Sequence, residues 1–319
     1  MITRLPAVAF VLAALATFGM STTAFTVAPR AHAGAPAELT PIAESATTLP
    51  DSAVEPRSPR PRELPLESSP SAPAPNPSPS PAATGQPVAR AALVLHVPVL
   101  MYHYIAVVPA TQATDRFAVD LRVPPDLFEQ HLAYLRAQGY GTISTPALWD
   151  ALNGRATLPA KPIVLTFDDG YADAYSNAFP LLRKYGFIGT FFVTCNLVGR
   201  PGYMTWDQVR ELDAAGMDIE SHAMDHKAMS AFNLGGLAYE MGQARATLGQ
   251  QLGHEVRFFA YPSGDFNATA LQGVAANGYF AAFLKAGGSS QSVDWRYTLR
   301  RTRVTGYASL ETFKVALGY

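Results

Sequence analysis

The sequence predicts an α/β domain over residues 93–319, built as a parallel barrel or as a doubly wound sheet. After Leu93, segments typical of strands alternate with segments typical of helices, about eight times. One of them, PIVLTF at 162–167, is the continuous apolar run expected of a strand that is buried on both faces. In either architecture, functional side chains gather where strands end and loops begin.

The expected strands and helices follow one another along the chain. Strands are predicted at LVLHVPVLMY (93–102), YGTIS (140–144), PIVLTF (162–167), IGTFFVT (188–194), MDIES (217–221), VRFFAY (256–261), YFAAF (279–283) and TLRRTRV (298–304). Helices are predicted at 124–139, from Thr145 to Asn153, at 176–186, from Thr205 to Gly216, at 234–253, before Asn277 and from Ser309. Thr205 and Gln208 have the spacing of a capping box, which fixes the start of one helix.

The first 92 residues differ in character from the rest of the chain. Residues 1–33 combine a basic start, an apolar run and a final Ala-His-Ala, as in a secretory signal peptide. The apolar run is shorter than the roughly 20 residues of a spanning helix, so a retained membrane anchor is the less favoured alternative. Residues 34–92 are rich in Pro, Ala and Ser and predict a disordered linker. We therefore expect an exported protein, either periplasmic or extracellular.

Composition excludes some classes of partner. The net charge is −1, which gives no reason to expect nucleic acid or an anionic membrane surface as a partner. The single cysteine, Cys195, lies in an apolar strand and is expected to be a buried structural thiol.

Two acidic residues, Asp168 and Asp169, follow PIVLTF directly and precede Gly170. Unpaired charges are too costly to bury within an apolar strand, but a metal and an open cleft at its carboxyl end can stabilise them. On a strand the two side chains would point to opposite faces, and a turn can aim both at one site. An ordinary solvated Asp-Gly turn is the alternative.

His222 and His226 strengthen the interpretation as a site. They follow the strand MDIES with three residues between them, so both imidazoles can reach one ion. Two histidines and one carboxylate with an open position form a catalytic zinc site, and Asp169 is the natural third ligand. The sequence therefore predicts a divalent metal, with Zn²⁺ favoured.

Further residues near these motifs are candidates for substrate contacts. The segment FFAYPSGDFN ends a strand in a Pro-Ser-Gly turn, a geometry that can present backbone N–H groups to an oxyanion. Among the flanking aromatic residues, Tyr171 and Trp206 are the ones we expect to stack on sugar rings, although most aromatic side chains at such spacing belong to a core.

Taken together, TFDDG (166–170), the His222/His226 pair and FAYPSG (259–264) resemble the polysaccharide deacetylase (NodB homology) domain of carbohydrate esterase family 4. The resemblance extends from Val97 to the end of the chain. VPVLMYH (97–103) and FAYPSGDFN are similar to the branch that acts on poly-β-1,6-N-acetylglucosamine. The resemblance implies a distorted (β/α) barrel and hydrolysis of N-acetyl groups from a polysaccharide.

The same resemblance implies a role for each matching residue. Asp168 would be the general base, and Asp169, His222 and His226 would hold the metal. The Ser263 N–H would stabilise the oxyanion, with Tyr261 beside it. The histidine acid usual late in the domain has no counterpart here, and the biofilm branch points instead to His103 in LMYHYI.

The sequence also departs from the family pattern. Ala223 stands where a serine or threonine usually braces the histidine loop, so we expect a looser loop. The motif arginine that pairs with the catalytic base is absent, and Arg301 or Arg303 could supply its charge. These departures keep two alternatives open: a non-catalytic glycan-binding module, and an O-acetyl esterase of the acetylxylan type.

Overall fold

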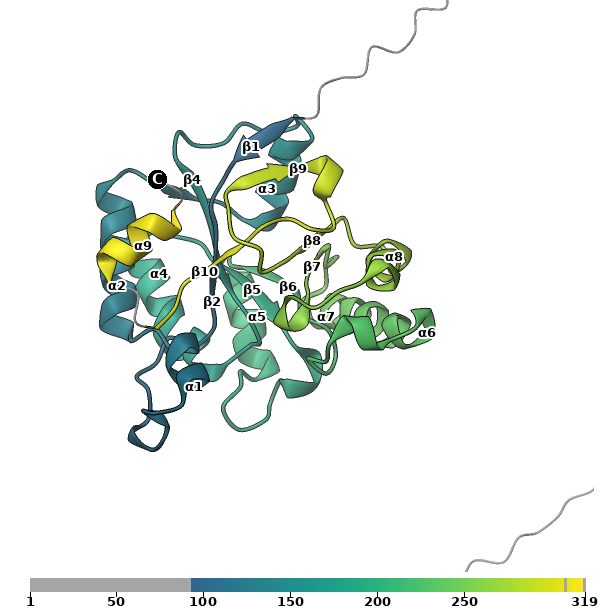
Figure 1. The fold of residues 1–319 in the computed structure, drawn as a ribbon, viewed down its shortest axis with the longest axis horizontal. Helices are drawn as coiled ribbons and strands as arrows, with labels where there is room; N and C mark the ends of the chain where they lie inside the picture. The colour runs from purple at the N-terminus through teal and green to yellow at the C-terminus, as the bar shows by residue number, and fades with distance from the viewer. Residues whose placement is uncertain (1–92, 307–308, 318–319) are drawn as a thin grey trace, which may run out of the picture. The chain divides into compact units, whose positions relative to one another are not determined.

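The computed structural model of the 319-residue chain describes residues 93–306 and 309–317, which form an α/β domain (Figure 1). The expected signal peptide (1–33) and linker (34–92) lie outside these residues. Among the residues described, no helix is both long enough and apolar enough to cross a membrane.

A parallel sheet forms the centre of the domain (Figure 1). The strands are β1 (Val94–His96), β2 (Val99–Tyr102), β3 (Gly141–Thr142), β4 (Pro162–Phe167), β5 (Thr190–Val193), β6 (Asp218–Ser221), β7 (Phe258–Ala260), β8 (Ala281–Phe283), β9 (Ser290–Ser292) and β10 (Thr302–Arg303). The sheet has the order β10-β2-β4-β5-β6-β7-β8, and β3 pairs with β4. Strands β1 and β9 form a separate antiparallel pair.

The strand order decides between the two predicted architectures. From β2 to β8 the central strands follow the order of the chain, whereas a doubly wound sheet reverses direction at a switch point. Strand β10 returns to lie beside β2, and a single bridge, Phe283 to Leu299, joins the end of β8 to the segment that leads into β10. The sheet is therefore a curled, open half-barrel, and the doubly wound alternative is wrong.

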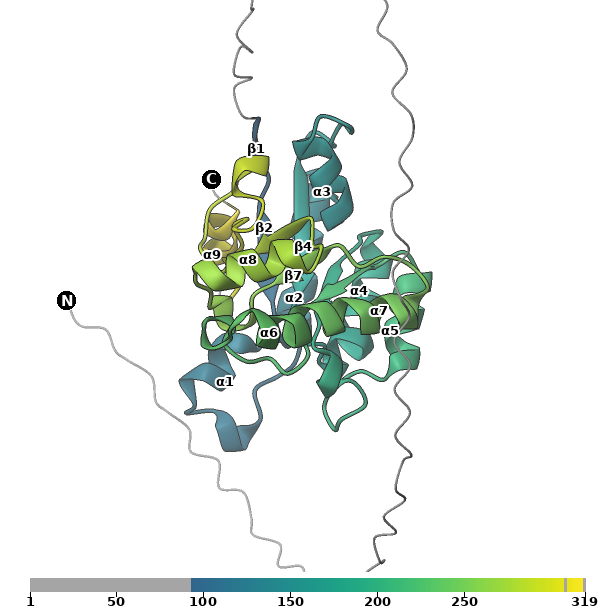
Figure 2. The same cartoon turned by 90° about the vertical axis from the view of Figure 1, so that its right-hand side faces the viewer.

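Helices surround the curled sheet, most of them on its outside, and α1 lies at its carboxyl end (Figures 1 and 2). They are α1 (Arg116–Leu121), α2 (Pro125–Ala137), α3 (Thr145–Leu152), α4 (Phe179–Tyr185), α5 (Trp206–Ala214), α6 (Leu234–Leu237), α7 (Ala244–Leu252), α8 (Ala268–Ala276) and α9 (Leu310–Ala316). The expected capping box of Thr205 and Gln208 is present, with both reciprocal hydrogen bonds. Helix α9 packs against α2, which places the end of the described chain beside its first long helix.

Some elements differ from the prediction. The single strand expected at 93–102 is two strands in different sheets, separated at Pro98, which has no N–H to continue a ladder. The strand expected at 298–304 is reduced to the two residues of β10. The helix expected at 234–253 contains a π-helical segment, Ala238–Gln243, between α6 and α7. Helix α1 and strand β9 were not predicted.

Successive residues of the central strands point to two different apolar layers. On β4, Leu165 and Phe167 pack into the layer below the helices, whereas Val164 packs with Phe192 of β5 inside the half-barrel. This two-sided burial explains the continuous apolar run of β4. The alternation also continues toward the carboxyl end, so that Asp168 follows Val164 and Thr166 on the inner face.

Glu220 strengthens the weakest junction between neighbouring central strands. Strands β6 and β7 are paired at one position, Ser221 with Phe259. The Glu220 carboxylate extends this junction, because its Oε2 accepts hydrogen bonds from the N–H groups of Arg257 and Phe258 at 2.9 and 2.8 Å. Burial, with a smaller contribution from Asp218, raises the pKa of Glu220 well above its usual range.

We predict that Glu220→Ala lowers the free energy of unfolding by about 3 kcal/mol, because two buried N–H groups lose their acceptor. Glu220→Gln keeps an acceptor and should cost much less. The pKa of Glu220 is higher in the folded state than in the unfolded state, so the proton on Glu220 stabilises the folded protein in acid. This stabilisation is lost as the pH rises through the folded-state pKa. The stability of the Gln variant relative to wild type should therefore increase from pH 5 to pH 8. Urea unfolding of the three proteins at both pH values measures this, and equal losses for Ala and Gln would contradict it.

Candidate functional site

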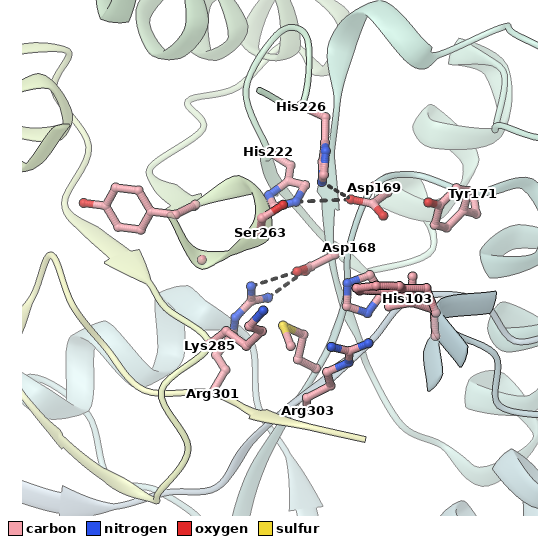
Figure 3. Close-up of a pocket in the computed structure, with 15 residues that line it drawn as sticks. His103, Asp168, Asp169, Tyr171, His222, His226, Ser263, Lys285, Arg301 and Arg303 are labelled. Atoms are coloured by element: carbon pink, nitrogen blue, oxygen red, sulfur yellow. Dashed lines mark hydrogen bonds and ion pairs between the residues drawn. The ribbon is translucent and has the colours of Figure 1, made fainter. Parts of the chain in front are cut away.

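A pocket of about 270 Å³ opens at the carboxyl ends of the central strands (Figure 3). Its walls come from the ends of β2, β4 and β6, from the turn after β7, from β10 and from α1. It is lined by Met101, His103, Phe117, Leu121, Asp168, Asp169, Tyr171, His222, His226, Tyr261, Ser263, Gly264, Lys285, Arg301 and Arg303. All but one of the predicted site residues therefore line a single pocket, and the exception is Trp206.

Asp168 and Arg301 form a buried, bidentate ion pair in the floor of this pocket (Figure 3). Arg301 Nη1 and Nη2 donate to the two oxygens of Asp168 at 2.6 and 2.8 Å. Burial raises the pKa of Asp168, but the Arg301 guanidinium, together with His222 and His103, outweighs burial and holds that pKa below its usual range. Arg301, one of the two arginines that the sequence offered, is thus the charge partner of Asp168.

Arg301 is itself held in place by several contacts. It is 1% exposed, and it also donates to Thr166 Oγ1 at 3.1 Å and to the Leu284 carbonyl at 3.2 Å. Its guanidinium lies 5.2 Å from the centre of the Phe192 ring. Arg303, the alternative suggested by the sequence, forms no ion pair with Asp168 or with any other carboxylate of the described chain, so that alternative is wrong.

Asp169, His222 and His226 converge on one point beside the ion pair (Figure 3). Asp169 Oδ1 lies 3.2 Å from His222 Nε2 and 3.0 Å from His226 Nε2. Although it is buried, this oxygen has no partner with hydrogen-bond geometry among the described residues. Ligands around a tetrahedral zinc ion, with bonds of about 2.0–2.2 Å, stand about 3.3 Å apart. The three residues therefore fit a metal of this kind.

The electrostatics of the cluster also suit a cation. Burial alone would raise the pKa of Asp169, but the two neighbouring imidazoles lower it well below its usual range. His222 Nδ1 lies 2.8 Å from the Ala260 carbonyl, which can only accept, so Nδ1 carries the proton and Nε2 is left with a lone pair facing the cluster. The donor set of two imidazoles and one carboxylate is the one that zinc prefers.

Backbone strain is concentrated at this site. Four residues other than glycine have a positive φ in the described chain: Asp169 (76°), Ala223 (69°), His226 (53°) and Ser263 (58°). Three of them are predicted site residues, and Ala223 follows His222, one of the predicted metal ligands. The positive φ of Asp169 shows how two consecutive strand-end carboxylates reach one pocket, because it turns the chain after Asp168. Such conformations cost about 1–3 kcal/mol each and are characteristic of functional sites.

The loop that carries both histidines is braced from outside. Glu240, in the π-helical segment, is buried, and its Oε2 accepts hydrogen bonds from the N–H groups of Met224 and Asp225 at 3.2 and 3.0 Å. The Ala223 carbonyl accepts a further hydrogen bond from the Cys195 N–H at 3.1 Å. These contacts oppose the loosening expected from Ala223. Glu240 was not predicted from the sequence, because its position depends on the π-helical turn.

The turn after β7 leaves one donor free to face the pocket. Gly264 N–H and Asp265 N–H donate within the turn, to Tyr261 and Pro262, whereas the Ser263 N–H donates to no residue in the described ranges. Tyr261 is buried in the pocket wall, and its hydroxyl donates to the Tyr297 carbonyl at 3.2 Å. The free N–H of Ser263 is therefore suited to an anionic oxygen.

His103 faces the carboxylates from the end of β2 (Figure 3). Burial lowers its pKa, and the charges of Asp168 and Asp169 partly oppose that effect. Its Nδ1 is buried and has no hydrogen-bond partner in the described part of the chain.

The aromatic residues are arranged differently from the prediction. Tyr171 lines the pocket and stacks between Tyr104 and Tyr203, with ring centres 3.5 and 5.1 Å away. Trp206 is half-buried against the main core and does not line the pocket, because its helix α5 packs on the outer face of the sheet. The exposed aromatic ring at the pocket belongs instead to Phe117, on the unpredicted helix α1.

Comparison with solved structures supports the fold. The Streptococcus pyogenes deacetylase PplD, solved in complex with acetate, aligns with a TM-score of 0.65 and 29% identity over 71% of this chain and 99% of its own. IcaB from Ammonifex degensii aligns with a TM-score of 0.60 and 27% identity over 70% of this chain and 97% of its own.

Comparison with known sequences identifies the domain. YxkH of Bacillus subtilis (strain 168), named as a polysaccharide deacetylase, is 29% identical over 65% of this chain and 71% of its own length. The poly-β-1,6-N-acetyl-D-glucosamine N-deacetylase of Escherichia coli (strain K12) is 26% identical over 53% of this chain, but only 31% of that protein is covered. Residues 155–282 match the family model for polysaccharide deacetylase. The resemblance drawn from TFDDG, the histidine pair and FAYPSG is thus confirmed over residues 155–282, which match the polysaccharide deacetylases, a family of hydrolases.

Proposed function

We propose that this chain is an exported, metal-dependent N-deacetylase that removes acetyl groups from a glycan containing N-acetylglucosamine. The observation that carries the proposal is the convergence of a metal-ligand cluster, a charge-paired carboxylate and a free backbone N–H on one pocket. Relatives named for poly-β-1,6-N-acetylglucosamine and for chitin make these two polymers the first substrates to test. Export rests on the sequence of residues 1–33 alone.

Asp169, His222 and His226 would hold the metal, with Zn²⁺ favoured by the donor set. A bound zinc ion would polarise the acetamide carbonyl and lower the pKa of a water beside it. Asp168, kept ionised by Arg301, accepts the proton of the attacking water. The Ser263 N–H donates to the oxyanion, a contribution of about 3–4 kcal/mol for donors of this kind. His103 holds the proton that passes to the departing amine nitrogen.

The glycan-binding alternative was suggested by the absent motif arginine and by Ala223, and it is weakened because Arg301 pairs with Asp168 without that motif. The O-acetyl esterase alternative uses the same pocket, and it differs from the N-deacetylase only in the substrate that is hydrolysed. Both enter the test below as outcomes.

We predict that the purified full-length chain releases acetate from β-1,6-linked N-acetylglucosamine oligomers or chitin oligomers, and that a chelator stops it. Asp168→Asn should lower kcat by about 10²–10⁴-fold, as expected on loss of a general base, while the bound metal is retained. Acetate assays and metal analysis on the same preparations measure both effects. Bound metal without acetate release from either glycan would favour the binding module, and release from acetylxylan alone would favour the esterase.

We predict that Arg301→Gln lowers the free energy of unfolding by about 3–5 kcal/mol, because it leaves the buried Asp168 carboxylate without its partner. Combining it with Asp168→Asn should recover much of this loss. Arg303→Gln, two residues along the same segment and without a carboxylate partner, is the matched control. Urea unfolding of the wild type, the two single variants and the double variant gives the coupling energy between Asp168 and Arg301. Additive effects of the two substitutions would show that the pair is not coupled.

We predict that Glu240→Ala weakens zinc binding by about 10–100-fold, the usual effect of removing a group that orients metal ligands. Glu240→Gln keeps an acceptor for the loop and should restore most of the affinity. Competition with a chelating dye at equilibrium measures the dissociation constant, independently of any activity. Glu255→Ala, an exposed site away from the pocket, is the control. Unchanged affinity in Glu240→Ala would mean that the loop needs no brace.

A further inference from the structure

Two cations in the pocket have no counter-charge. Arg301 is neutralised by Asp168, but Arg303 and Lys285, which line the same pocket, form no ion pair with any residue that the structure describes. Once a divalent metal is bound at Asp169, positive charge exceeds negative charge in the pocket. An unpaired, partly buried cation is unfavourable unless a bound anion neutralises its charge.

Arg303 reaches the pocket because of its register in the sheet. It pairs with Met101 on β2, so its side chain points to the inner face, as does that of His103 two residues further along (Figure 3). Its Nε and Nη2 are buried without an acceptor in the described residues, while the side chain as a whole is half-buried. No existing hydrogen bond of these two nitrogens has to break when the guanidinium turns toward a ligand. Nε and Nη2 form the edge of the guanidinium that pairs bidentately with a carboxylate.

Lys285 lies on the β8 side of the junction between β8 and the segment that leads into β10, whereas Arg303 lies on the β10 side. It follows β8 and lies against the turn that holds Ser263: a Cβ placed on Gly264 would stand 3.0 Å from Lys285 Cβ. Its side chain is exposed and, in Figure 3, it points into the same hollow as the metal-ligand cluster. The edges that carry Lys285 and Arg303 are joined by hydrogen bonds such as Leu284 N–H to the Leu299 carbonyl, at 2.8 Å.

We propose that Arg303 and Lys285 form a subsite for a carboxylate on the sugar next to the N-acetylated one, so that the preferred substrate is an acidic N-acetylated glycan. The proposal rests on the proposed deacetylase function and names its substrate class. A neutral glycan presents only hydroxyl groups to these side chains and leaves both charges unpaired. A carboxylate pairs with both, and the acetamide group stays free to reach the metal cluster and the Ser263 N–H.

The test compares substrates that differ only in charge. Oligosaccharides of alternating N-acetylglucosamine and glucuronate are offered to the metal-loaded full-length chain with free carboxylates or as methyl esters, and kcat/KM is measured for acetate release. We expect the acid to be preferred by about 10-fold or more, as for a charge-assisted contact. Arg303→Gln, Lys285→Gln and their combination should remove the preference. Lys161→Gln, whose ammonium binds the Gln138 carbonyl away from the pocket, should keep it.

Three outcomes overturn the proposal, and a fourth separates it from the proposed function. Equal kcat/KM for acid and ester in the wild type, or a preference that survives in the double variant, removes the subsite. If the variants lose only inhibition by free acetate, the two cations bind the product and not the glycan. If no glycan is deacetylated, the proposed function fails, and calorimetric binding of the acid and ester forms still decides whether the subsite exists.

Discussion

The Arg301–Asp168 ion pair lies where the apolar interior of the half-barrel ends, and the rest of the site is arranged around it. Asp168 points inward because residues of β4 alternate between two faces, and an inward carboxylate in such surroundings needs a fixed positive partner. Arg301 provides one with two hydrogen bonds and is itself held by Thr166 and Leu284. With Asp168 satisfied, Asp169 is the carboxylate left for a metal.

The fold and most of the site could be predicted from the sequence, because the signals are local. The apolar run of β4, the strand-end Asp168–Asp169 pair and the histidine spacing each depend on a few neighbouring residues. Arg301 was one of two possibilities, since only the pairing of β10 with β2 decides which arginine meets Asp168. Glu240 and Phe117 were missed, because a π-helical turn and an unpredicted helix place them. Trp206 was assigned to the site from its aromatic character alone, which does not distinguish a core residue from a binding residue.

Strain and bracing complement each other at the histidine loop. Ala223 and His226 have left-handed backbone conformations, which are unfavourable for residues with a Cβ. The Glu240 carboxylate, which accepts hydrogen bonds from the loop, and the Cys195 N–H, which donates one to it, hold the loop in this form from segments outside it. The geometry of the metal ligands is thus set by the surrounding fold and not by the loop sequence.

The open seam of the half-barrel has a consequence for motion. Strand β10 is two residues long, and the segment before it joins β8 through one bridge, at Leu299, and a few backbone hydrogen bonds, so its regular strand pairing is shorter than that of most central strands. Segments of this kind open locally without global unfolding. Because Arg301 belongs to this segment, such an opening withdraws the counter-charge from Asp168 and leaves Asp169, His222 and His226 in place. Amide exchange at Thr302 and Arg303 would therefore report the separation of Arg301 from Asp168 independently of any change at Asp169, His222 and His226.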